Sequence, residues 1–258
     1  MTLEILNVFP ERFDVNGDRG NVLALQRRLE WAGIEVRVTE LALGDGWPSR
    51  SPDLVHIGGG TVAAQRSALP ALRSERERVS DWLAAGTPFL AVAGGLQLSA
   101  TRVLLPGDEF EEEGLGVFDA WSRPTGGHRS GPLVGESGDW GTLFGYEHLA
   151  QSIELAAAQA PLSCVVAGSG NVFTPGTDGA RSGTAFGSHS HGPLLPKNPR
   201  FTDHLIALAL MHAGEGDYRL TERHRAADAL AERGRAVLAR RLNLSAFDAV
   251  TQKPKVSR

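Results

Sequence analysis

The fifteen residues from Gly86 to Ala100 constrain the fold more than any other part of the chain. After a Gly-Thr-Pro turn they continue as a short apolar run, Phe89 to Val92. Such a run is typical of a strand buried on both faces of a parallel sheet. The pair Gly94-Gly95 then leads into an expected helix from Leu96. The stretch therefore predicts a sharp strand-to-helix turn centred on Ala93.

Turns of this kind present one side chain at the carboxyl end of a parallel strand. Backbone N–H groups at the start of the following helix point toward whatever reacts there. The residue at the turn is therefore expected to be a nucleophile. Here it is Ala93, whose methyl group cannot attack a substrate. The turn thus predicts a reaction site and, at the same time, the loss of its nucleophile.

The N-terminal third of the chain alternates strands with helices. Strands are expected over Leu3–Phe9, Ile34–Thr39 and Asp53–Ile57, with a helix over Val22–Ala32 between the first two. This order predicts a parallel sheet with helices on both faces, and ligands bind at the carboxyl edge of such sheets. Gly58-Gly-Gly60 follows the third strand and is interpreted as a pocket wall beside Ala93. A simple tight turn is the alternative, and the missing Lys-Ser/Thr argues against a phosphate-binding loop.

The rest of the chain is expected to add an antiparallel or mixed edge to this sheet. The acidic loop Leu104–Glu113 is interpreted as surface rather than as a metal site, because no histidine accompanies its glutamates. A frayed tail is expected over Lys253–Arg258. The other expected strands are Gly116–Trp121, Leu133–Glu136, Thr142–Tyr146, Ser163–Ala167 and one from Gly183, and the expected helices are Ala71–Ala85, Ala150–Ala160, Asp203–His212 and Leu220–Leu242.

Composition limits the classes of function. The chain has 258 residues, 41% of them hydrophobic, and a net charge of −4, so neither nucleic acid nor an anionic membrane is an expected partner. No apolar run approaches the roughly 18 residues of a membrane span, so we expect no membrane insertion, a cytoplasmic location and one domain over 1–258. The single cysteine, Cys164, lies in an apolar strand and is expected to be a buried, inert thiol. Ser99 lies too far into the helix to act as a nucleophile.

Three motifs carry a resemblance to a known family. Ala93-Gly-Gly resembles the turn of class I glutamine amidotransferases, where a cysteine precedes the two glycines. Ser190–Pro199 resembles the His-Gly-Pro-Leu-Leu-x-x-Asn-Pro motif of the CobB/CobQ-like branch, which selects His191 and not His189. Asn16–Asn21 resembles a Gly-Asp-Arg-Gly-Asn stretch of the glutaminase subunit of lipid II isoglutaminyl synthase. Gly127–Gly131, which contains Arg129, resembles the same family more weakly.

This resemblance implies a three-layer α/β sandwich with a mostly parallel sheet, and it assigns the site residues. His191 would be the base beside the nucleophile position, and Arg129 would hold the α-carboxylate of the substrate. Backbone N–H groups near Gly59 and Gly94 would form the oxyanion hole, and Gly60 and Gln97 would also contact substrate. Asp18 and Arg19 would most simply form a buried or partner-facing ion pair. No cofactor or metal is implied.

By the same resemblance, the chain would bind L-glutamine and supply ammonia to a Mur-ligase-like, ATP-using partner. The two would form a heterodimer that amidates lipid II for peptidoglycan. The sequence departs from the family at Ala93, at Thr61-Val62 and at Tyr146-Glu-His148. Several departures together favour natural degeneration over an engineered change of the cysteine alone. A catalytically inactive pseudo-glutaminase that binds or regulates a partner is therefore the alternative. A cobalamin-pathway amidotransferase, which normally carries a fused synthetase domain, is a third and less favoured one.

Overall fold

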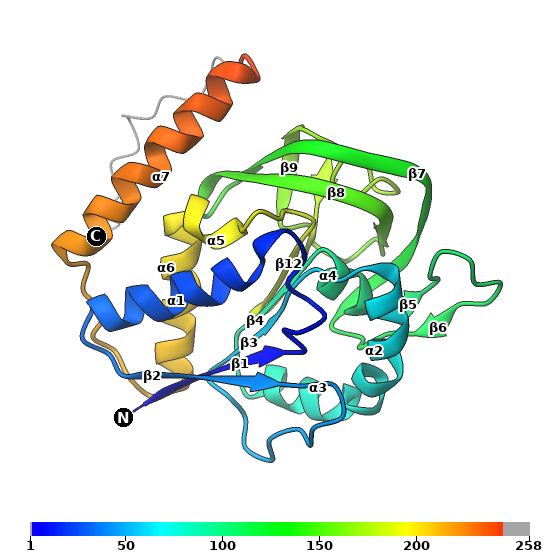
Figure 1. Ribbon diagram of the computed structural model, residues 1–258, viewed down its shortest axis with the longest axis horizontal. Coiled ribbons are helices and arrows are strands. Elements are labelled where there is room, and N and C mark those ends of the chain that lie inside the picture. Colours follow the sequence, from blue (N-terminus) through cyan, green and yellow to red (C-terminus); the bar gives the residue numbers. More distant parts are fainter. Residues whose placement is uncertain (1, 245–258) are drawn as a thin grey trace.

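The computed structural model describes residues 2–244, and its main sheet contains six strands (Figure 1). Neighbouring strands are parallel except at one edge, where β11 runs antiparallel to β12. This arrangement confirms the predicted mostly parallel sheet with an antiparallel edge. The strands expected after Gly114 do not supply that edge, because they form a second sheet. In spatial order the strands are β11 (Ala180–Ser182), β12 (Ala185–Ser188), β4 (Phe89–Val92), β3 (Leu54–Ile57), β1 (Leu3–Val8) and β2 (Val36–Leu41).

Helices cover both faces of this sheet. On one face, α1 (Arg19–Trp31), the short α5 (Leu194–Lys197) and α6 (Pro199–His212) bury apolar side chains against β1, β3 and β4. On the other face, α2 (Val62–Ser74) and α3 (Arg76–Ala84) form a second core with the same strands and with part of a second sheet. The two cores make the sheet the middle layer of the molecule (Figure 1).

The second sheet is built around a long antiparallel hairpin. Strand β7 (Phe118–Ser137) pairs with β8 (Gly141–Leu155), and three of the short strands expected from the sequence are parts of these two. The helix expected over Ala150–Ala160 is wrong, because residues up to Leu155 pair with β7. The remaining strands are β5 (Ala100–Val103), β6 (Glu112–Glu113), β9 (Ser163–Ala167) and β10 (Thr177–Asp178).

Several boundaries differ from those expected. The charged helix expected over Ala71–Ala85 is two helices that break at Glu75, and the first begins much earlier, at Val62, where the Thr61 side chain accepts a hydrogen bond from the Ala64 N–H. Helix α4 (Gly94–Leu98) ends after five residues and is followed directly by β5. The tail expected over Lys253–Arg258 lies outside the described residues.

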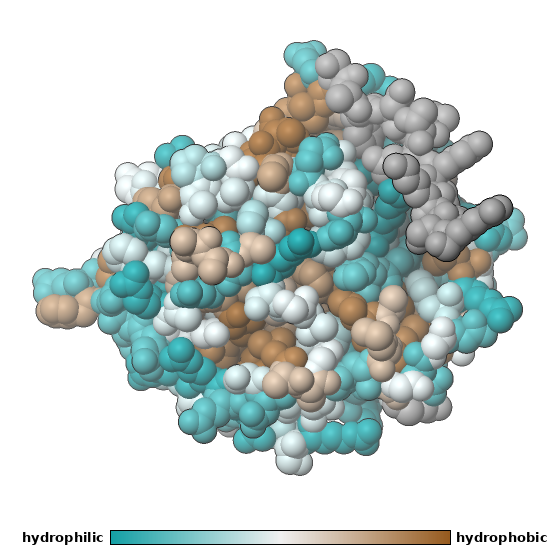
Figure 2. All heavy atoms as spheres, turned by 180° about the vertical axis from the view of Figure 1, so that it is seen from behind, coloured by the Kyte–Doolittle hydropathy of each residue, from teal (hydrophilic) through white to brown (hydrophobic). Residues whose placement is uncertain are grey.

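Helix α7 (Glu222–Arg241) projects along one side of the molecule (Figure 1). Its first turn is held by His224, whose Nε2 lies 2.8 Å from the Arg28 carbonyl oxygen of α1. On the face seen in Figure 2, hydrophobic residues occur in patches separated by hydrophilic ones. None of the described helices is both long enough and apolar enough to span a bilayer.

Candidate active site

The turn at Ala93 has the strained backbone that the sequence predicts. Ala93 has a φ of 45° and a ψ of −103°, and its N–H donates to the Ser188 carbonyl oxygen at 2.8 Å. A β-carbon on Gly94 would lie 2.6 Å from the Gly60 nitrogen, and one on Gly95 would lie 2.5 Å from the Ile57 carbonyl oxygen. Only glycine fits at these two positions, because the turn packs directly against the end of β3. The buried Ala93 methyl therefore stands where a nucleophile would.

His191 lies in the loop after β12, with its backbone paired to Tyr146 of β8. Its Nδ1 is 3.0 Å from the Asp18 Oδ2, and both side chains are buried. A carboxylate only accepts hydrogen bonds, so Nδ1 carries the proton and Nε2 is left as the basic nitrogen. Asp18 and His191 thus form the orienting half of a catalytic triad.

This contact corrects the expected pairing of Asp18 and Arg19. Asp18 is fully buried behind His191, whereas the Arg19 side chain lies at the surface, 2.7 Å from Glu40. The two neighbours point to different sides because helix α1 begins here, and the Arg19 N–H donates to the Asp14 carboxylate at 2.6 Å. The role of Asp18 was missed from the sequence. The available signal was its place after the first strand, at the edge where ligands bind.

The two sequence motifs around Asp18 and His191 pack against each other. The Asn21 Oδ1 accepts a hydrogen bond from the Leu195 N–H at 2.8 Å. A β-carbon on Gly20 would lie 2.5 Å from Pro193, so the start of α1 touches the loop that carries His191. Asn198 fixes the other end of that loop by hydrogen bonds to the Phe144 backbone. The motifs are therefore two halves of one support for the Asp18–His191 pair.

Ala93 and His191 line the same cavity, which has a volume of about 210 Å³. Gly60, Gly94 and Gln97, which were expected to contact substrate, also line it. The Gln97 side chain is held in place, since its Nε2 donates to the Gln151 carbonyl oxygen at 2.8 Å and its Oε1 accepts from Gln65 at 2.9 Å. The other lining residues are Val15, Asn16, Thr61, Val62, Gln65, His128, His148, Ala150 and Gln151. No aspartate or glutamate is among these described lining residues.

The expected oxyanion-hole donors need one correction. The Gly59 N–H donates to the Asp18 Oδ2 at 2.7 Å, so this amide is engaged in orienting the dyad. The N–H groups of Gly60 and Gly94 donate to no other group within residues 2–244. These residues line the cavity beside Ala93, so their amides are the better candidates for stabilising negative charge.

Arg129 does not lie among the residues that line the cavity. It is exposed on β7, and the preceding residue, His128, lines the cavity instead, because neighbouring side chains of a strand point to opposite faces. The Nε2 atoms of His128 and His148 are 2.9 Å apart. Burial, together with the nearby His128 and His191, lowers the pKa of His148. The role of Arg129 in holding a carboxylate stays a prediction.

The alternative nucleophiles lie outside the cavity. Cys164 was expected to be buried, which is wrong: it is exposed on β9, opposite Thr177 of the edge strand β10. The buried Ser99 donates its hydroxyl hydrogen to the Gly95 carbonyl oxygen at 2.7 Å. Neither side chain can replace the nucleophile missing at position 93.

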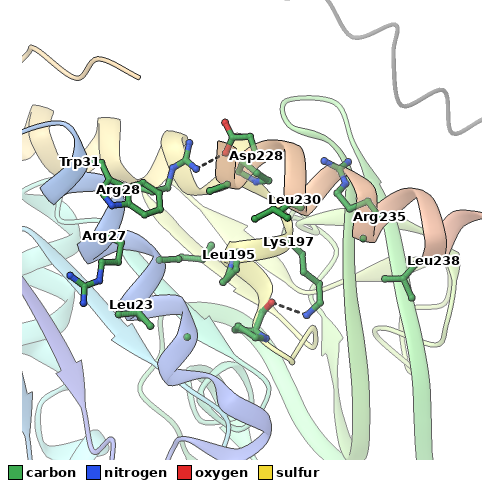
Figure 3. Close-up of a pocket in the computed structure, with 18 of the residues that line it drawn as sticks. Leu23, Arg27, Arg28, Trp31, Leu195, Lys197, Asp228, Leu230, Arg235 and Leu238 are labelled. Carbon is green, nitrogen blue, oxygen red and sulfur yellow. Dashed lines mark hydrogen bonds and ion pairs between the residues drawn. The ribbon is translucent and has the colours of Figure 1, made fainter. Parts of the chain in front are cut away.

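A larger cavity of about 900 Å³ lies between α1, α5 and α7 (Figure 3). Leucines from all three helices point into it, among them Leu23, Leu195 and Leu230. The charged Arg28 at its end is bonded to Asp203 and Asp228. Its lining within residues 2–244 is mainly apolar, with charged side chains such as Lys197 and Arg235 among the leucines, and it holds no histidine–carboxylate pair like Asp18–His191.

Comparison with known proteins agrees with this geometry. The CobB/CobQ-like glutamine amidotransferase domain matches residues 4–199. The lipid II isoglutaminyl synthase (glutamine-hydrolyzing) subunit GatD of Staphylococcus aureus is 30% identical over 82% of this chain and 86% of its own length. The corresponding Streptococcus pneumoniae subunit is 28% identical over 81% of this chain and 80% of its own length. A glutamine amidotransferase structure from Thermotoga maritima shares the fold, with a TM-score of 0.52 and 17% identity. The match covers 93% of this chain and 94% of that structure.

The family match covers the turn at Ala93, the Asp18 region and the His191 loop, together with the other segments that line the cavity. The chain belongs to the CobB/CobQ-like glutamine amidotransferase family.

Proposed function

We propose that this chain is a GatD-type subunit of a lipid II isoglutaminyl synthase complex that binds an amino acid but does not hydrolyse glutamine. The observation that carries the proposal is the Ala93 methyl group on a strained turn, in one cavity with an otherwise complete Asp18–His191 pair. A chain that had lost its whole site would have no physical reason to retain this geometry.

The reaction of a thiol in this position explains what is missing. A cysteine would give its proton to the His191 Nε2 and attack the side-chain carbonyl carbon of glutamine. The oxyanion would be stabilised by the Gly60 and Gly94 amides, and the imidazolium would return the proton to the leaving ammonia. Water would then hydrolyse the thioester to release glutamate. A methyl group has neither the lone pair nor the acidic proton that the first step requires.

The partner we propose is a Mur-ligase-like subunit that uses ATP. Support comes from the two relatives, which are named as subunits of a glutamine-hydrolyzing synthase. Without hydrolysis, this chain would serve the partner as a binding or regulatory subunit, and the partner would take free ammonia.

Substitution of the nucleophile position tests the proposal. The purified chain and its Ala93→Cys variant are incubated with L-glutamine, and glutamate release is measured. We expect no release above the blank for the natural chain and at least 100-fold more for Ala93→Cys. The double variant Ala93→Cys/His191→Gln is the matched control and should return to the blank. Hydrolysis by the natural chain, or an inactive Ala93→Cys variant that is folded, would contradict the proposal.

A further inference from the structure

The loss of the thiol changes the charge balance of the cavity. Its described lining residues include no carboxylate, and at position 93 there is now no sulfur that could ionise. The Gly60 and Gly94 N–H groups have no acceptor within residues 2–244. Next to them lies His191, whose Nδ1 is 3.0 Å from the Asp18 carboxylate. This end of the cavity therefore offers hydrogen-bond donors and lacks negative charge of its own.

We infer that this cavity prefers an amino acid with a side-chain carboxylate, of the size of L-glutamate, over the carboxamide L-glutamine. The inference rests on the proposed function, because it places the ligand side chain where a substrate amide would react. It goes beyond that function by naming an acid, rather than an amide, as the resident ligand.

Hydrogen-bond chemistry supports the acid. A carboxylate only accepts, so its oxygens can take the Gly60 and Gly94 N–H groups and also an Nε2–H of His191, which gains that hydrogen if one proton binds together with the acid. Hydrogen bonds of this kind involve an ionised group and are roughly twice as strong as neutral ones. A carboxamide has one accepting oxygen. One of its N–H groups can donate to the neutral His191 Nε2, but the other would face the Gly60 and Gly94 donors. A donor without an acceptor in a buried site weakens binding considerably.

Hydrogen-bond acceptors, rather than donors, are present elsewhere in the cavity wall. The buried Gln65 and Gln151 line the cavity, and the Oε1 of each accepts no hydrogen bond from the described residues. The orientation of Gln65 is fixed, because its Nε2 donates to both Gln97 and the Gly60 carbonyl oxygen. These oxygens suit an α-ammonium group, which glutamate and glutamine share. These oxygens favour any ligand with an α-ammonium group, whereas the donors near His191 favour a side-chain carboxylate over a carboxamide.

The size of the cavity limits the ligand further. Its volume of about 210 Å³ is below the range of roughly 300–1,000 Å³ that is typical of pockets for drug-sized ligands. A nucleotide or a peptide would not fit within it. A single small amino acid is the ligand class that the volume, the donors and the acceptors allow together.

Calorimetric titration of the full natural chain with L-glutamate and with L-glutamine tests this inference. We expect glutamate to bind at least 10-fold more tightly. The variant His191→Gln should lose most of this preference, because an amide cannot take up the proton that accompanies the acid. His212→Gln is the matched control, since His212 lies near Ser51 and Thr87 and lines no part of the cavity. It should keep the preference of the natural chain.

A second variant separates selectivity from general damage. Gln65→Leu removes an acceptor for the ammonium group, so it should weaken both ligands by a similar factor and leave their ratio unchanged. Equal affinities in the natural chain, or tighter binding of glutamine, would overturn the inference. So would an unchanged preference in a folded His191→Gln variant.

The result is independent of the test of the proposed function. If Ala93→Cys hydrolyses glutamine while the natural chain prefers glutamine, only the inference about the acid fails. If the natural chain prefers glutamate while Ala93→Cys is folded and inactive, only the proposal of a hydrolytic scaffold fails.

Discussion

Two cavities of this protein show that size and chemistry do not go together: one is small and lined by oriented polar side chains, and the other is large and mainly apolar. The cavity at Ala93 has a volume of about 210 Å³ and several hydrogen-bonded polar side chains in its wall, whereas the one between α1, α5 and α7 has about 900 Å³ and a wall that is mostly aliphatic. The smaller one lies at the carboxyl edge of the sheet, where three sequence motifs meet. The comparison teaches that convergence of oriented polar groups, rather than volume, identifies the site of reaction.

The largest expected effect concerns the orientation of His191 in the small cavity. In the Ala93→Cys background, Asp18→Asn should lower kcat for glutamine hydrolysis by about 10²- to 10⁴-fold, because the amide would no longer fix Nε2 as the base. Steady-state kinetics of glutamate release measures this effect. A folded variant that retains full kcat would show that Asp18 only supports the fold.

The next effect concerns the ion cluster at the end of the large cavity. Arg28 is buried and bonds Asp203 at 2.7 Å and Asp228 at 2.6 Å. Although burial works against its charge, the hydrogen bonds and charges of these two aspartates raise the pKa of Arg28. Arg28→Ala would leave two carboxylates without their partner and should lower the free energy of unfolding by about 3 kcal/mol.

Urea denaturation checks this value. The control is Arg27→Ala, since Arg27 is exposed and, within residues 2–244, its ion pair is with Glu30, one turn away on the same helix. We expect that control to change stability by less than about 0.5 kcal/mol. Equal effects of the two substitutions would mean that the cluster does not hold α7 against α1.

A smaller effect is expected from pH in the region behind the small cavity. Burial lowers the pKa of His56 to about 4 and that of His189 to about 3, so the folded state disfavours both charged imidazoles. Stability should fall as the pH decreases from about 6.5 toward 4, where the unfolded chain takes up these two protons. Burial raises the pKa of Asp178 to about 6, which acts in the opposite direction over this range.

Between the two pKa ranges the unfolded chain binds two histidine protons and the folded protein binds one at Asp178, a net difference of one proton. The free energy of unfolding should therefore change by about 1.4 kcal/mol per pH unit. Urea denaturation between pH 4.5 and 6.5 measures it. His56→Asn should remove most of this slope. A stability that rises on acidification would show that Asp178 outweighs the two histidines.

The smallest effect is expected at the wall of the large cavity. The side chain of Leu230 is 61% exposed on α7, so it contributes little to the folded core. Leu230→Gln should therefore change the free energy of unfolding by less than about 0.5 kcal/mol. Hydrolysis in the Ala93→Cys background should also be unaffected. A large loss of either property would show that the large cavity is coupled to the site.

The parts of the fold that were predicted correctly are those with a local cause. Strand β4 is a continuous apolar run between glycines, and its bounds follow from burial on both faces. The long β7–β8 hairpin was missed, because its glycines and exposed polar residues have the pattern of separate short strands. Helix α2 was started too late, since the N-cap at Thr61 follows three glycines that indicate a loop.

The site residues that could be predicted are likewise those marked by a local sequence pattern. Ala93 and His191 stand in motifs that can be recognised one at a time. The contact between Asp18 and His191 joins residues 173 positions apart, so no local pattern indicates which carboxylate orients the imidazole. The placement of Arg129 depends on which face of β7 each residue occupies, and the bulge between Pro124 and Arg129 sets that alternation.

The backbone at Ala93 has a practical consequence. Because its positive φ is already present with a β-carbon attached, a reporter group on this β-carbon would leave the main chain unchanged and lie where the methyl group lies now. A fluorine in place of one methyl hydrogen would thus place a ¹⁹F nucleus directly in the ligand cavity with little added volume. Its chemical shift would report occupancy by each amino acid in solution without any need for turnover.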